Sequence, residues 1–230
     1  MSLPHDEHHS TASATVRDLV LGMADGLTVP FALAAGVAGA VADSRIVVTA
    51  GLAEVSAGAI AMGLGGYLAA RGDIDHFRAE RDREWRETHA IPDEERREVA
   101  EIFEGYGLAR DEARRIADKL SEDRGRWVDF MMRFELGLEE PDANRAPRSA
   151  LTIGASYVAG GLIPLAPYVV LHRIDQALPW SAVLTLLALV CFGAAKGYLT
   201  GGGAWRSALQ TAAIGSCASL VAFLIARLVH

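Results

Sequence analysis

The sequence predicts an all-α membrane protein, a bundle of five transmembrane helices with a cytosolic three-helix insert between the second and third spans. Five apolar stretches approach or exceed the roughly 20 residues that a helix needs to cross a bilayer. Charge is concentrated in one segment: of the 29 Asp and Glu residues 22, and of the 22 Lys and Arg residues 16, lie between Arg71 and Arg148. Such segregation indicates two membrane-spanning regions separated by a soluble insert.

The expected spans are long, rich in Ala and Leu, and lack the period-two alternation of transmembrane strands. They cover residues 16–41, 46–70, 150–171, 178–199 and 207–229. The chain therefore divides into a disordered polar tail (1–15), transmembrane helices 1 and 2 (16–70), a cytosolic helical domain (71–148), whose candidate metal ligands are given below, and transmembrane helices 3 to 5 (149–230). We expect His5, His8 and His9 in the tail to be solvated rather than bound to a metal.

The insert is predicted to continue as helix over 73–104, with a break and a restart at which Pro92 takes a first-turn position. A third helical region over 108–138 is expected to be jointed near 121–125. Because the insert is so highly charged, it is most easily left in the cytosol. Five spans then place the N-terminus inside and the C-terminus outside.

Several apolar-segment residues carry structural expectations of their own. Pro30 in the first span and Pro164 and Pro167 in the third are expected to interrupt helical hydrogen bonding. Cys191 and Cys217 are interpreted as small core residues rather than a disulfide or zinc ligands.

Two aspartates lie in the first apolar stretch. Asp18 and Asp25 are seven residues apart, so on a helix they share one face. A carboxylate in hydrocarbon costs several kcal/mol unless it meets water, a partner or a cation. The pair therefore predicts a functional site within the membrane.

The second span adds Glu54 and, two turns later, Met62, which can face one cavity with it. Hard cations such as Ca²⁺ and Mg²⁺ prefer oxygen ligands alone, whereas a thioether favours softer transition metals. For Met62 alone, core packing is the alternative interpretation.

The insert carries acidic pairs at three-residue spacing, which places both side chains on one helix face. The candidate ligands are Glu84 and Glu87, Glu95 and Glu98, and the group Met131, Met132 and Glu135. The alternative for any one pair is a solvated face with arginine partners. Together, five glutamates and two methionines, with the methionines interrupting an otherwise polar surface, would attract divalent transition metals. The insert lacks the Glu-x-x-His pairs of ferritin-like di-iron bundles.

Three long segments, RDLVLGMADGLTVPFALAAG, GLAEVSAGAIAMGLGGYLA and GGLIPLAPY, resemble the vacuolar iron transporter family. The resemblance implies five spans, a homodimer, and export or sequestration of Fe²⁺, often also Mn²⁺, in exchange for protons. By position, Asp25, Glu54 and Met62 match the family's membrane site, with Asp18 on the cytosolic side of the path. The seven insert residues above match its cytosolic metal-binding domain. The GGYLA and TVPFAL runs resemble the fungal and bacterial branch more than the plant one.

The predicted function is thus proton-coupled transport of divalent transition metal out of the cytosol. The alternative is a membrane-anchored metal sensor or buffer that moves no metal. An enzyme is not expected, because neither a nucleophile with a base nor an HExxH motif appears. The expected partners are protons, the lipid bilayer, a second copy of the chain and the transported ion (Fe²⁺, with Mn²⁺, Co²⁺ and Zn²⁺ as other candidates). No separate cofactor is expected, and no nucleic acid, since acids outnumber bases. Short loops and no targeting extension suggest a prokaryotic plasma membrane.

Overall fold

The computed structural model describes residues 10–41, 43–199, 201 and 203–229, and the regular structure among them is helical apart from one bridge between Asp43 and Arg173. The helices of this described part are α1 (Ser10–Ala40), α2 (Ser44–Ala90), α3 (Pro92–Gly105), α4 (Arg110–Ser121), α5 (Arg124–Phe134), α6 (Arg145–Val170), α7 (Ile174–Leu199) and α8 (Ala204–Val229). Five of them, α1, α2, α6, α7 and α8, are long and apolar enough to cross a membrane. The prediction of an all-α protein with five spans is confirmed.

The chain folds as two compact units. The first comprises Met1–Leu68 and Ala146–His230, and the second Ala69–Arg145. Helix α2, which is 47 residues long, contributes to both. Helix α1 begins at Ser10, so it includes residues that we assigned to the polar tail, whereas His5, His8 and His9 lie outside the described residues.

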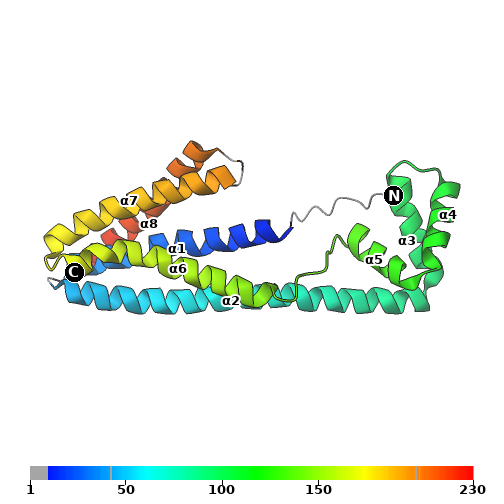
Figure 1. The fold of residues 1–230 in the computed structure, drawn as a ribbon, viewed down its shortest axis with the longest axis horizontal. Helices are drawn as coiled ribbons and strands as arrows, with labels where there is room; N and C mark the ends of the chain where they lie inside the picture. The colour runs from blue at the N-terminus through cyan, green and yellow to red at the C-terminus, as the bar shows by residue number, and fades with distance from the viewer. Residues whose placement is uncertain (1–9, 42, 200, 202, 230) are drawn as a thin grey trace, which may run out of the picture. The chain divides into compact units, whose positions relative to one another are not determined.

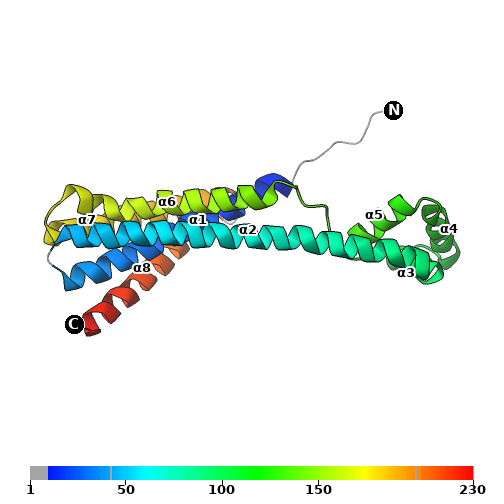
Figure 2. The same ribbon diagram turned by 90° about the horizontal axis from the view of Figure 1, so that it is seen from below.

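In the first unit, the long helices lie lengthwise beside one another, and Figures 1 and 2 show this from two directions. Small residues allow two close crossings. A Cβ atom added at Gly26 of α1 would lie 2.3 Å from the carbonyl oxygen of Tyr157 on α6, and one at Gly193 of α7 would lie 2.8 Å from Cα of Ala208 on α8. At these points the helix backbones touch directly, as small residues at four-residue spacing permit.

Helix α1 runs through Pro30, and α6 runs through Pro164 and Pro167. Each proline lacks the N–H donor of a helical hydrogen bond, as we expected, but none of them ends its helix. One expectation about the spans was wrong. The thiols of Cys191 and Cys217 are free, as we expected, but both residues are exposed on the surface of the chain rather than buried in its core.

The second unit consists of the end of α2 together with α3, α4 and α5. Helix α3 starts with Pro92 in its first turn, and the side chain of Asp123 caps α5 by accepting hydrogen bonds from the backbone of Gly125 and Arg126 at 3.1 and 3.2 Å. The chain is jointed where α4 ends at Ser121 and α5 begins at Arg124. The unit therefore has four helical segments, whereas we expected three helices in the insert.

Two apolar clusters hold the second unit together. One contains Val99, Ala100, Ala113, Ala117, Trp127 and Met131, and the other contains Phe77, Val128 and Met132. The rings of Phe103 and Phe130 stack at a centroid distance of 5.2 Å beside the first cluster. These contacts tie α3, α4 and α5 to one another and to the end of α2.

Candidate metal-binding sites

The acids predicted in the first span lie on α1 and are withdrawn from the surface to different degrees. Asp18 is buried, with an exposed fraction of 3%, and Asp25 is half-buried. Because α1 is continuous between them, their spacing of seven residues keeps them on one side of the helix, as predicted.

Glu54 of α2 meets a partner that the sequence analysis missed. The hydroxyl of Tyr157, a buried residue of α6, donates a hydrogen bond to Glu54 Oε1 at 2.5 Å. The second carboxylate oxygen, Oε2, is buried and has no hydrogen-bond partner among the described residues. A buried carboxylate oxygen without a donor is unstable as an anion, so it is ready to accept a cation or a proton.

Tyr157 is held against α2 by the absence of a side chain. A Cβ atom at Gly58, one turn after Glu54, would lie 2.4 Å from the tyrosine hydroxyl oxygen. Tyr157 therefore joins α6 to the acid of α2. Met62, two turns after Glu54 on α2, is half-buried.

One signal in the sequence could have revealed Tyr157. It stands in the run GASYVAGG, in which it is the one polar side chain large enough to reach a neighbouring helix. A tyrosine buried in a spanning helix needs a partner for its hydroxyl, and an acid of another span is the natural acceptor.

In the second unit, the glutamates come from three elements: Glu84 and Glu87 from α2, Glu95 and Glu98 from α3, and Glu135 from the residue after α5. Glu84 and Glu95 are buried, with exposed fractions of 2% and 3%, and Oε2 of each has no hydrogen-bond partner in the described structure. Burial, and then the charges of Glu84 and Glu98, raise the pKa of Glu95 to about 7.

The charges of the same group of acids act on Glu135. Desolvation of its carboxyl group, and then the charges of Glu84 and Glu98, raise its pKa to about 7, although much of the residue is exposed. Desolvation also raises the pKa of Glu98. The five acids are thus close enough to repel one another, and such a set binds protons or cations.

We expected Met131 and Met132 to interrupt a polar surface, and this was wrong. Both are buried, and they pack in different apolar clusters, Met131 beside Trp127 and Met132 beside Phe77. Their packing role is therefore evident, and a ligand role stays a prediction.

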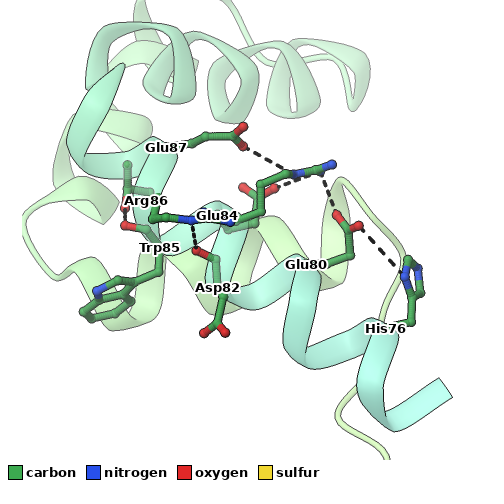
Figure 3. A network of polar contacts seen from close by, with 9 residues as sticks. His76, Glu80, Asp82, Glu84, Trp85, Arg86 and Glu87 are labelled. Carbon is green, nitrogen blue, oxygen red and sulfur yellow. Dashed lines mark hydrogen bonds and ion pairs between the residues drawn. The ribbon is translucent and has the colours of Figure 1, made fainter. Parts of the chain in front are cut away.

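Among the described residues, no three His, Cys, Asp or Glu side chains lie close enough together to hold a metal ion. The glutamates of the second unit interact through their charges without converging on one point. One competing cation is Arg83, which forms ion pairs with Glu80, Glu84 and Glu87; these three acids are labelled in Figure 3. The arginine partner that we weighed as the alternative is thus present for Glu84 and Glu87.

The fold and these residues define a class: a multi-pass helical membrane protein with carboxylates inside its spans and a second, acid-rich helical unit. Comparison with known proteins narrows the class. The model of the VIT family matches residues 16–227, and the chain belongs to this family.

The relatives cover nearly the whole chain. A protein named vacuolar iron transporter from Centaurea cyanus is 54% identical over 97% of this chain and 91% of its own length. Vacuolar iron transporter 1 of Arabidopsis thaliana is 53% identical over 98% of this chain and 90% of its own. Protein CCC1 of Saccharomyces cerevisiae is 38% identical over 81% of this chain and 58% of its own.

These identities correct one expectation from the resemblance. Over the matched residues the plant proteins are more similar to the chain than the yeast protein is, which does not support the greater likeness to the fungal branch that we expected from the GGYLA and TVPFAL runs. The names of the plant relatives refer to the vacuole, and they give no support to the predicted prokaryotic plasma membrane.

Proposed function

We propose that this chain transports divalent transition metal, Fe²⁺ and also Mn²⁺, out of the cytosol in exchange for protons. The observation that carries the proposal is Glu54, an acid within a spanning helix that has one oxygen held by Tyr157 and the other buried without a partner. An acid at this depth is unfavourable in a mere anchor, and it is what a path for cations needs. The names of the plant relatives agree with this function.

The path within the membrane consists of Asp18, Asp25, Glu54 and Met62. Asp18 lies toward the cytosolic end, and Tyr157 holds one oxygen of Glu54. Carboxylates with one thioether favour a divalent transition metal over Ca²⁺ or Mg²⁺.

The second unit captures metal from the cytosol before transport. Its proposed ligands are Glu84, Glu87, Glu95, Glu98, Met131, Met132 and Glu135. The buried, unpartnered oxygens of Glu84 and Glu95 support this role. Since no three acids converge in the described structure, metal must draw them together when it binds.

Competition between metal and protons gives a physical basis for exchange. A bound cation favours the ionised carboxylate, whereas desolvation favours the protonated one. Metal arrival at Glu54 and Asp25 therefore releases protons, and protons from the opposite side release the metal. We propose in addition that the chain acts as a homodimer.

Flux through liposomes tests transport and coupling together. We expect purified wild-type chain to move Fe²⁺ or Mn²⁺ with an opposing movement of protons, and Asp25→Asn or Glu54→Gln to abolish both while the helical content is kept. Asp175→Asn is the matched control, because Asp175 is an exposed acid of the same unit that pairs with Arg173 at 2.6 Å. Undiminished exchange in both path variants would contradict the proposal.

The same assay separates a transporter from a membrane-anchored sensor or buffer, which would move no metal. Glu95→Gln combined with Glu98→Gln should weaken metal binding and slow flux without abolishing it. Normal flux with unchanged metal binding would assign the second unit a structural role.

A further inference from the structure

Arg83 forms ion pairs with three carboxylates of its own helix, those of Glu80, Glu84 and Glu87, and Figure 3 labels these acids. Its Nη2 atom is 2.9 Å from Oε2 of Glu80 and 3.3 Å from Oε1 of Glu84, and its Nε atom is 3.5 Å from Oε2 of Glu87. Two of these three acids, Glu84 and Glu87, are proposed metal ligands. The arginine therefore occupies oxygens that a metal would need.

The three carboxylates are not equivalent. Glu84 has an exposed fraction of only 2%, and its Oε2 has no partner among the described residues, whereas the Arg83 side chain is 45% exposed. The guanidinium thus reaches one oxygen of Glu84 from the solvent side and leaves the other unsatisfied. A small divalent ion could satisfy both oxygens, which the bulky guanidinium does not.

Glu80 is an ion-pair partner that Arg83 can keep when metal binds. It is three residues away on the same helix face, and it is not among the proposed ligands. If metal takes Glu84 and Glu87, Arg83 keeps its shortest ion pair. Displacement of the arginine is therefore partial, and it does not leave a charge without a partner.

Neighbouring arginines of α2 do not share this position. Arg81 pairs with Asp129 at 3.1 Å, and Arg86 donates to the backbone carbonyl oxygen of Asp82 at 3.1 Å. Neither of these contacts involves a proposed ligand. Arg86 also precedes Glu87 directly in the sequence, so it places a positive charge near the same acid as Arg83 does.

We propose that Arg83 is a tethered counter-ion that divalent metal must displace from Glu84 and Glu87, and that this competition sets the metal concentration at which the second unit becomes loaded. The inference rests on the proposed metal-binding role of that unit. It assigns Arg83 a function in setting affinity: the arginine stabilises the empty acid cluster and is exchanged for metal when the cytosolic concentration rises. No part of it depends on transport through the spans.

Calorimetric titration of the full chain in detergent with Mn²⁺ tests the inference. The binding phase of the second unit is identified as the one that Glu95→Gln combined with Glu98→Gln removes. We expect Arg83→Gln to tighten this phase about three- to tenfold, since the ion pairs of an arginine that is 45% exposed are individually weak. The charge-matched control, Arg86→Gln, should change it less than about twofold. The affinity of Arg83→Lys for Mn²⁺ should lie between those of the wild type and Arg83→Gln, because an ammonium group cannot bridge three carboxylates as the planar guanidinium does.

The results that overturn the inference are distinct from those that overturn the proposed function. An unchanged or weaker phase in Arg83→Gln, or an equal gain in Arg86→Gln, would show that Arg83 does not compete with metal. A wild-type chain with no phase that the Glu95 and Glu98 changes remove would overturn the metal-binding role of the unit, and this inference with it. Circular dichroism of each variant confirms that the helices are retained.

Discussion

Tyr157 on α6 donates its hydroxyl hydrogen to Glu54 on α2 across 2.5 Å, and this hydrogen bond joins helices that are about a hundred residues apart in the sequence. The bond fixes one carboxylate oxygen and leaves the other buried and free to bind a cation. Its donor therefore fixes the orientation in which Glu54 presents its other oxygen to a metal ion.

Tyr157→Phe removes that donor and keeps the ring. A hydrogen bond to a charged group contributes about 1.5–3 kcal/mol, so we expect the apparent affinity for Mn²⁺ in liposome flux to fall by about tenfold or more. Tyr168→Phe is the control, because Tyr168 is another buried tyrosine of α6. Equal effects of the two substitutions would argue against a specific role of the Tyr157 hydroxyl.

Gly26→Ala should destabilise the first unit. The added Cβ would lie 2.3 Å from the carbonyl oxygen of Tyr157, and overpacking of this kind costs about 1–3 kcal/mol. The matched control is Gly65→Ala on α2, where a Cβ meets nothing within 4 Å and alanine favours the helix by about 0.5–1 kcal/mol. Thermal unfolding in detergent measures both, and a midpoint for Gly26→Ala that is no lower than the control's would contradict the direct backbone contact.

The methionines of the second unit can be tested for ligation separately from packing. Met131→Leu conserves volume and should cost less than about 1.5 kcal/mol, whereas Met131→Ala should cost about 2–5 kcal/mol because Met131 is fully buried. If the thioethers of Met131 and Met132 bind metal, the leucine variants lose affinity for Co²⁺ more than for Mn²⁺. Equal retention of both metals in a calorimetric titration would leave only the packing role.

Metal binding by the second unit should depend on pH near neutrality. Glu95 and Glu135 have pKa values of about 7, so each binds a proton that metal must replace at pH 6 and is largely ionised at pH 8. We expect the Mn²⁺ affinity of the full chain to rise between these pH values. Glu95→Gln should reduce the slope, and a slope that this change leaves intact would contradict the assignment.

The same acids make the stability of the metal-free protein fall as pH rises. Their pKa in the folded chain is above the ordinary value of 4.5, so their stabilising contribution is complete below about pH 4.5 and is lost as pH rises through about 7. The metal-free second unit should therefore unfold at a lower temperature at pH 8 than at pH 6, as differential scanning calorimetry can measure. Added Mn²⁺ should raise the midpoint more at pH 8.

The fold was predictable to the extent that it depends on hydrophobic length and charge segregation. The spans follow from apolar runs whose backbone must be hydrogen-bonded internally in lipid, and the acids Asp18 and Asp25 stood out because charge is unfavourable there. Burial of Cys191 and Cys217 was wrongly predicted, because the sequence shows that a span is apolar and does not show which of its faces contacts lipid.

The sites were less predictable because they depend on contacts between distant helices. Spacing places Glu84 and Glu87 on one face of α2, and it does not show that Arg83 pairs with both. The role of Tyr157 depends on α6 crossing α2 at Gly58, which no local pattern specifies. The burial of Met131 and Met132 depends likewise on how α5 packs.

The glycine contacts between α1 and α6 have a consequence for movement during a transport cycle. At Gly26 and Gly160 the two backbones meet with no side chain between them, so no rotamer change can absorb a sliding motion. We therefore expect α1 and α6 to move as one rigid body. Opening of the path to alternate sides of the membrane must then come from the helices that meet this pair through longer, adjustable side chains, such as Leu189 of α7, which packs against Leu27 of α1.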